Sequence, residues 1–130
     1  MNLFYSVKSD YNFDMTMQIL RDGLAQKQFT VLAEFNLAQK LHANNLPYED
    51  ELFVLEVCNP TYAFAVLSTK PKSKYLLPCR ITVAGSDVVS VGMLNYNDFS
   101  SLGYQLSKSE SYVLNEIKDI LNQVVNKQMS

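Results

Sequence analysis

The order of strand-like and helix-like segments constrains the fold of this chain more than any single motif. Residues 3–7 alternate between apolar and polar side chains, which is the period of a half-buried strand. Residues 13–24 instead carry apolar side chains three and four positions apart, as an amphipathic helix does, and Asn12 precedes them as an N-cap. Residues 29–35 return to the period of two. The chain is therefore predicted to begin strand, helix, strand.

The middle of the chain adds three more predicted strands and one ambiguous segment. Strands are predicted over 51–58, 79–84 and 87–94, and a hairpin turn at 85–87 joins the last two. Residues 37–48 fit either a short helix or a loop, because a helix-like start runs into a stretch rich in asparagine and proline.

The last segment is the clearest helix. Ser107 and Glu110 have the spacing of a capping box, although Ser109 is a rival cap. The helix is expected to run for about 20 residues, roughly 30 Å at the standard rise. Its apolar stripe consists of Val113, Ile117, Ile120, Leu121 and Val124.

Strands and helices do not alternate strictly along the chain, which disfavours a doubly wound parallel sheet. We therefore expect an α+β fold, with an antiparallel sheet of about five strands and the helices packed on one face. The 130 residues suit a single domain over 1–130, without repeats or a linker. With 48% hydrophobic and 18% charged residues, the composition excludes a disordered chain.

Charge and apolar runs limit the classes of partner. The 11 basic and 13 acidic residues give a net charge of −2, whereas general nucleic-acid binders carry a basic excess, so nucleic acid is not an expected partner. No apolar run reaches the roughly 18 residues of a membrane span, and the first residues lack the pattern of a secretory signal. We expect a cytoplasmic protein whose two cysteines, Cys58 and Cys79, stay reduced.

The step Cys58-Asn59-Pro60 is the most informative motif. Asn59 suits a helix N-cap and Pro60 suits the first helical position, so Cys58 is predicted to end a strand beside a helix N-terminus. The free N–H groups at such a terminus favour a thiolate and lower the pKa of a cysteine. The candidate ligand-binding residues are therefore Cys58, Asn59, Pro60 and Cys79.

Two interpretations of the cysteines compete. Free cysteine is among the most buried residue types, so both thiols can equally be core residues. Strand parity places Cys79 on a buried face and places Cys58 on the face opposite to Val57. If that parity holds to the strand ends, the two thiols point to opposite faces of the sheet.

The motifs resemble the prokaryotic family called domain of unknown function 302. Its members carry a Cys-Asn-Pro step, as at 58–60 here, then an alanine-containing helix and a Leu-Pro-Cys step that opens a strand, as at 77–79. Residues 12–14 and 29–34 are similar to the family's first helix and the strand after it. The resemblance implies a TATA-binding-protein-like fold of order β-α-β(4)-α, here with an extra helix after the third strand, and a homodimer. It implies no activity, substrate or cofactor, so the cofactor stays unknown.

Two departures limit what carries over from the family. Glu56-Val57 precede the Cys-Asn-Pro step where members often have small residues, and Leu94-Asn95-Tyr96 stand where many members have an Asp-Pro pair. A function that depends on that aspartate is therefore not expected in this chain.

Other candidate sites are incomplete. His42 is the sole histidine and its spacing from the cysteines matches no zinc motif, so no metal site is predicted. Glu34 and Glu56 could share one sheet face and perform acid–base chemistry, but solvated positions on half-exposed strands explain them as well. The basic cluster at 70–74, with Arg80 nearby, suits either an anionic ligand or a solvated turn.

The third predicted strand is apolar on both faces. Leu52 and Val54 oppose Phe53, Leu55 and Val57. A helix layer covers only one face, so a partner subunit, a ligand or residues 37–48 must cover the other. We therefore expect a homodimeric module that binds a small molecule or a protein at the Cys-Asn-Pro step. The alternative is a thiol-dependent enzyme or redox protein that uses Cys58, with or without Cys79, and the sequence does not decide whether the chain is an enzyme.

Overall fold

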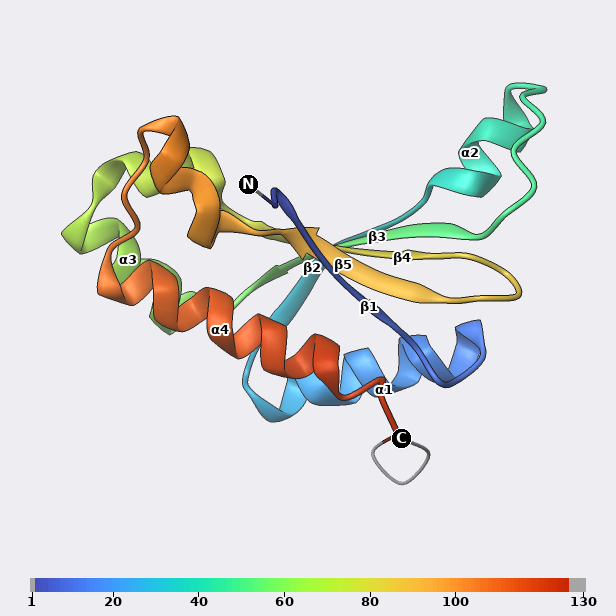
Figure 1. The fold of residues 1–130 in the computed structure, drawn as a ribbon, viewed down its shortest axis with the longest axis horizontal. Coiled ribbons are helices and arrows are strands. Elements are labelled where there is room, and N and C mark those ends of the chain that lie inside the picture. Colours follow the sequence, from blue (N-terminus) through green and yellow to red (C-terminus); the bar gives the residue numbers. More distant parts are fainter. Residues whose placement is uncertain (1, 127–130) are drawn as a thin grey trace.

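The computed structural model describes residues 2–126 and has the predicted α+β class. Its sheet has the strand order β1-β5-β4-β3-β2, and every neighbouring pair is antiparallel (Figure 1). The strands are β1 (Phe4–Lys8), β2 (Thr30–Asn36), β3 (Leu52–Cys58), β4 (Cys79–Ala84) and β5 (Ser90–Leu94). The helices are α1 (Phe13–Gln26), α2 (Leu37–Ala43), α3 (Pro60–Thr69) and α4 (Lys108–Asn122), with two short 3-10 helices, η1 (Pro71–Leu76) and η2 (Tyr96–Leu102).

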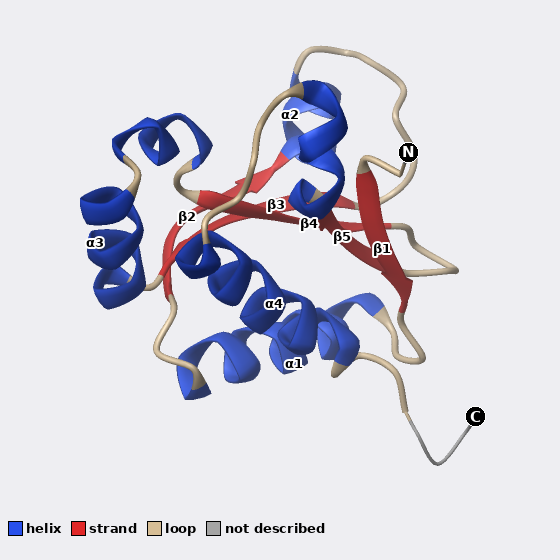
Figure 2. Cartoon of the chain, turned by 60° about the vertical axis from the view of Figure 1, so that its left-hand side comes forward, coloured by secondary structure: helices blue, strands red, loops and turns tan. Residues whose placement is uncertain are grey.

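The core lies between the sheet and the pair of helices α1 and α4, which cover one sheet face (Figure 2). We call this the helix face and the other side of the sheet the open face. Fully buried side chains of the core come from all these elements: Leu20, Leu24, Leu55, Ile81, Val83, Val91, Ile117, Ile120 and Leu121. Burial of this apolar surface is the main force that holds the helices on the sheet.

Local capping fixes where the two covering helices begin. The Asn12 side chain accepts a hydrogen bond from the Met15 backbone N–H at 2.8 Å, as predicted for the start of α1. Ser107 and Glu110 form the predicted capping box of α4, with N···O distances of 3.1 and 2.8 Å, so Ser109 is not the cap. These three bonds satisfy backbone donors that have no partner inside the helix.

The helix α4 has 15 residues and ends at Asn122, which is shorter than the sequence pattern suggests. Val124 belongs to the buried stripe, but its backbone N–H bonds Leu121 in a terminal turn. The apolar spacing therefore predicts correctly that Val124 is buried, but it does not mark where the helix ends.

Close packing of α1 against α4 explains why residue 23, within α1, is a glycine. A Cβ atom at this position would lie 2.7 Å from Gln123 Oε1 and 3.1 Å from Ile120 Cγ2. Both distances are shorter than ordinary van der Waals contact, so the absence of a side chain lets the two helices approach.

The ambiguous segment 37–48 begins with a short helix on the open face. The Asn36 side chain caps α2 by accepting a hydrogen bond from the Gln39 N–H at 3.0 Å. α2 contacts β3, and Figures 1 and 2 show it on the opposite side of the sheet from α1 and α4. Ala38 of α2 and Val54 of β3 are both buried. The expectation that all helices pack on one face is therefore wrong, and this segment supplies part of the second cover that β3 requires.

A β-bulge in β2 reverses which side chains face the core. The pairing shifts between Val31 and Ala33, so Glu34 lies opposite Leu55 on the helix face while Phe35 lies opposite Val54 on the open face. Simple alternation over 29–35 predicts instead that Phe35 shares the face of Val31 and that Glu34 lies on the other face. The guanidinium of Arg21 on α1 bonds the Glu34 carboxylate at 2.7 Å, and Phe35 is 44% exposed. An extra residue in one strand changes the parity of everything that follows it.

The β4–β5 connection is a loop over 85–89 rather than a turn over 85–87, so β5 begins at Ser90. Gly85 has a φ of +101°, and a Cβ there would lie 1.9 Å from the Val88 carbonyl oxygen. Glycine is required at this position because other residues would meet both backbone strain and a clash. Within residues 2–126, no helix is long and apolar enough to cross a membrane.

Candidate functional site

The Cys-Asn-Pro step is held by hydrogen bonds that use both groups of the Asn59 side chain. Its carbonyl oxygen accepts a bond from the Tyr62 N–H at 3.2 Å, which caps α3 as predicted, and Pro60 is the first residue of that helix. Its amide group donates to the Lys27 carbonyl oxygen at 3.1 Å. Asn59 is buried. The carbonyl oxygen and the amide group of Asn59 are therefore both hydrogen-bonded, and together they join α3 to the end of α1.

The two thiols lie at the same end of the sheet. Cys58 is half-buried, Cys79 is buried, and neither forms a disulfide. Val57 lies opposite Cys79 in the β3–β4 register, and Cys79 is on the helix face, as strand parity predicts. Both cysteines border one cavity of about 20 Å³. A cavity of that size has room for about one water molecule and not for an organic ligand.

Burial opposes thiolate formation at both cysteines. It raises the pKa of Cys58, and together with the neighbouring Cys58 it raises the pKa of Cys79 to about 11. A helix N-terminus was expected to lower the pKa of Cys58. The pKa of Cys58 is instead raised, because removal from water disfavours the charged thiolate.

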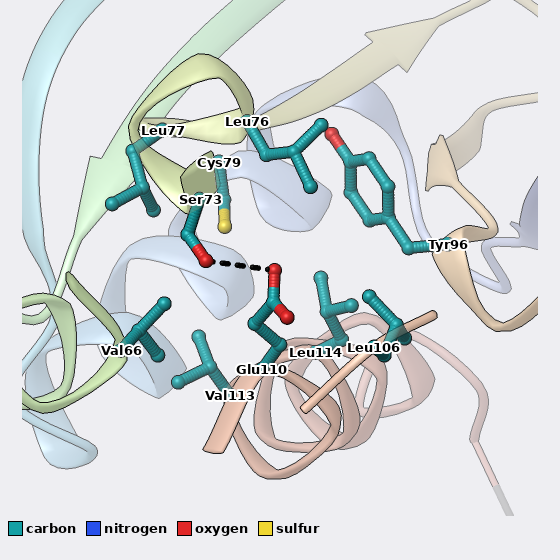
Figure 3. A pocket seen from close by; sticks show the side chains of 10 residues that line it. All are labelled: Val66, Ser73, Leu76, Leu77, Cys79, Tyr96, Leu106, Glu110, Val113 and Leu114. Carbon is teal, nitrogen blue, oxygen red and sulfur yellow. Dashed lines mark hydrogen bonds between the residues drawn. The ribbon is translucent and has the colours of Figure 1, made fainter. Parts of the chain in front are cut away.

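A second small cavity, of about 30 Å³, lies between η1 and the start of α4. The Glu110 carboxylate accepts hydrogen bonds there from the Ser73 hydroxyl at 3.0 Å, the Tyr104 hydroxyl at 2.6 Å and the Ser107 N–H at 2.8 Å. Figure 3 shows the Ser73–Glu110 bond and the Cys79 sulfur directed into the same cavity.

Glu110 is only 6% exposed. Burial alone would raise the pKa of its carboxyl group, but the bonds from Ser107, Tyr104 and Ser73 outweigh that effect and lower the pKa. The group of bonds around Glu110 fastens η1 to α4. Ser73 was expected in a solvated turn and is instead buried by this contact.

The other candidate groups from the sequence are not brought together. Glu34 lies on the helix face, and Glu56 lies opposite Ala33 and Arg80 on the open face, so they form no carboxylate pair. The His42 ring contacts the Tyr48 carbonyl oxygen. Within residues 2–126, no cluster of histidine, cysteine, aspartate and glutamate could hold a metal ion.

A hollow of about 610 Å³ lies on the open face, and it is much larger than the two cavities beside Cys79. Its floor is formed by β1, β5 and β4, and its walls by η1, η2 and the segment that leads into β4. We call it the open-face groove. Its lining residues are Phe4, Tyr5, Ser6, Tyr75, Leu76, Leu77, Pro78, Arg80, Thr82, Gly92, Met93, Leu94, Tyr96 and Phe99.

The floor of the groove is a row of small side chains. Thr82, Gly92 and Ser6 lie opposite one another across β4, β5 and β1. A Cβ atom on Gly92 would lie 3.0 Å from the Tyr5 carbonyl oxygen. The glycine thus leaves the middle of the sheet surface low, while Phe4 and Leu94, paired in the next row, rise beside it.

Arg80 is the sole acidic or basic residue among the groove-lining residues. In the part of the chain that the structure describes, its guanidinium has no hydrogen-bond or ion-pair partner. The Tyr96 hydroxyl likewise makes no hydrogen bond to a described residue, yet it is not sealed from solvent. The sequence raised Arg80 as part of a basic cluster, but it gave no sign that the side chain faces a groove.

A smaller hollow of about 230 Å³ lies between α3 and the start of α4. Tyr62 and Tyr112 border it, with their rings edge to face at 5.3 Å and their hydroxyl groups 3.4 Å apart. Ala65 and Lys108 complete its rim. None of its lining residues lines the open-face groove.

Comparison with known proteins agrees with the resemblance found in the motifs. A protein from Bacillus stearothermophilus, described as an uncharacterized conserved protein DUF302, has a crystal structure with a TM-score of 0.85 to this chain. The two sequences are 25% identical, and the alignment covers 94% of this chain and 98% of the other. No curated protein matches the sequence. The profile of the family "Domain of unknown function DUF302" matches residues 5–127, so the chain belongs to that family.

Proposed function

We propose that this chain is a binding module for a small organic molecule, and that its site is the open-face groove. The observation that carries the proposal is the volume of the groove. About 610 Å³ falls within the roughly 300–1,000 Å³ of typical ligand pockets, whereas the two cavities bordered by Cys79, of about 20 and 30 Å³, are too small for an organic ligand.

The lining of the groove also suits a ligand site. It is mostly aromatic and aliphatic, and a few polar groups from Arg80, Tyr96, Thr82 and Ser6 converge on it. Such a combination is typical of small-molecule sites, where the apolar surface supplies binding energy and the polar groups fix orientation. The raised pKa of both thiols gives the thiol-enzyme alternative no support. The homodimer and the cytoplasmic location stay predictions.

A neutral fluorescent probe tests the proposal. N-phenylnaphthylamine is an uncharged aromatic compound that brightens on leaving water, so it reports an apolar site without assuming a charge on the ligand. We expect saturable binding of one probe per chain. Thr82→Phe fills the floor of the groove and should remove this binding while the circular dichroism spectrum and the thermal midpoint stay close to those of the wild type.

A matched variant controls for non-specific adsorption. Ala65→Phe adds the same ring to the smaller hollow between α3 and α4 and should leave probe binding unchanged. The proposal is contradicted if a folded Thr82→Phe protein binds the probe as well as the wild type. It is also contradicted if neither this probe nor a charged analogue binds in a saturable manner.

A further inference from the structure

The geometry points to a small amphipathic anion as the ligand of the open-face groove, with its negative group on Arg80 and its apolar body against the aromatic walls. This inference rests on the proposed function and narrows it to one chemical class. Carboxylate, sulfonate and phosphate groups share the chemistry that an arginine recognises.

The charge of the groove is one-sided. Arg80 lines it, and no aspartate or glutamate is among the lining residues. Lys74 is not a lining residue, but its ammonium group lies 5.4 Å from the centre of the ring of Tyr75, which is one, so a second cation stands beside the groove. An anion that enters from solvent therefore meets attraction from both cations and no carboxylate on the groove wall.

Hydrogen-bond donors lie where the negative group would bind. The guanidinium of Arg80 offers several N–H donors in a planar fork, and no described residue uses them. Tyr96 also lines the groove, and its hydroxyl is close enough to Arg80 for an electrostatic interaction between the two. Thr82 follows on the same strand face, two residues along β4. An anion would thus find two or more donors that the protein itself leaves unpaired.

The apolar side of the groove lies directly beside this cation. Leu94 and Phe4 face each other across β5 and β1 and are 41% and 68% exposed, although both are large apolar side chains. Tyr75 of η1 also lines the groove and is 79% exposed. Covering these side chains with an apolar ligand body would remove them from water, which a small inorganic anion would not do.

Glu56 is the nearest competitor for Arg80. It lies opposite Arg80 in the β3–β4 register, on the same open face, but the two do not form an ion pair. Glu56 sits on the β3 side of Arg80, whereas the groove extends toward β5 and β1. Its carboxylate should therefore weaken the hold of Arg80 on an anion without blocking the groove.

Two probes that differ by one sulfonate test the inference. Anilinonaphthalene sulfonate has the ring system of N-phenylnaphthylamine and carries one negative charge. We expect the wild type to bind the sulfonate at least tenfold more tightly. Arg80→Gln should weaken sulfonate binding about tenfold, which corresponds to the loss of one charge-assisted hydrogen bond, and should barely change binding of the neutral probe.

Two further variants give the test its controls. Arg21→Gln changes the chain's other arginine, on the far side of the sheet, and should affect neither probe. Glu56→Gln should tighten sulfonate binding and leave the neutral probe unchanged. Arg80→Gln and Glu56→Gln are thus expected to change the affinity for the sulfonate in opposite directions. A general loss of fold would lower the affinity in both variants.

Other results with the two probes would contradict either the anionic ligand alone or the proposed small-ligand function as well. Equal affinity for both probes, unaffected by Arg80→Gln, contradicts the anion and leaves the small-ligand function standing. Failure of both probes to bind contradicts both. If neither probe binds and the wild type is a dimer that Thr82→Phe converts to a monomer, then a second copy of the chain occupies the groove.

Discussion

At the scale of single residues, burial governs the ionisation of the two cysteines. Both have a pKa raised above the ordinary value of 9.0, so both are neutral thiols at neutral pH. A disulfide reagent that attacks thiolates should label both slowly in the native protein. Labelling should accelerate as the pH rises past that value, with Cys58 ahead of the more buried Cys79.

The unfolded chain is the control for this experiment. In urea both thiols should react at equal rates and faster than in the native protein, because burial no longer separates them from water. Rapid labelling of Cys58 alone at neutral pH would contradict the prediction and would favour the thiol-dependent enzyme.

At the scale of elements, Glu110 joins η1 to the start of α4 and to the segment just before it. It receives bonds from Ser73 on η1, from Tyr104 after η2 and from the cap of α4. Its lowered pKa means that the carboxylate stabilises the fold above the ordinary value of 4.5, and that this stabilisation is lost as the pH falls through the folded-state pKa. Glu110→Gln should lower the unfolding free energy at neutral pH by about 1–3 kcal/mol.

The pH dependence separates this effect from simple loss of packing. The stability difference between the wild type and Glu110→Gln, measured by urea unfolding, should shrink in acid as the wild-type carboxylate becomes protonated. Glu49→Gln alters an exposed carboxyl group and should change stability little at either pH. A Glu110→Gln difference that stays constant from neutral pH into acid would refute the role of the charge.

Elements whose signals are local could be predicted from the sequence. Asn12, Asn59 and Ser107 each begin a helix at the expected position because a cap needs only its own next three residues. The bulge that turns Phe35 to the open face could not be predicted, because it depends on how β2 pairs with β3, which follows only after α2 and a loop. The groove was missed for a similar reason: its walls, η1 and η2, come from segments without periodicity and meet only in the folded sheet.

At the scale of the whole molecule, the open face divides into two parts. The groove occupies the β1 side, where η1 and η2 rise above the sheet, and α2 stands on the β3 side. β2 is the edge strand next to β3, and its Leu32 and Phe35 are 57% and 44% exposed. Exposed apolar side chains on an edge strand are a surface that another chain can cover.

The predicted homodimer can be tested at this edge. Sedimentation equilibrium at high micromolar concentration should give twice the monomer mass of 14.8 kDa. Phe35→Glu should shift the protein toward monomer, since a contact through β2 would have to bury the new charge. Thr82→Phe should leave the dimer intact, because it alters only the groove. A wild type that remains monomeric at high micromolar concentration would contradict the predicted homodimer.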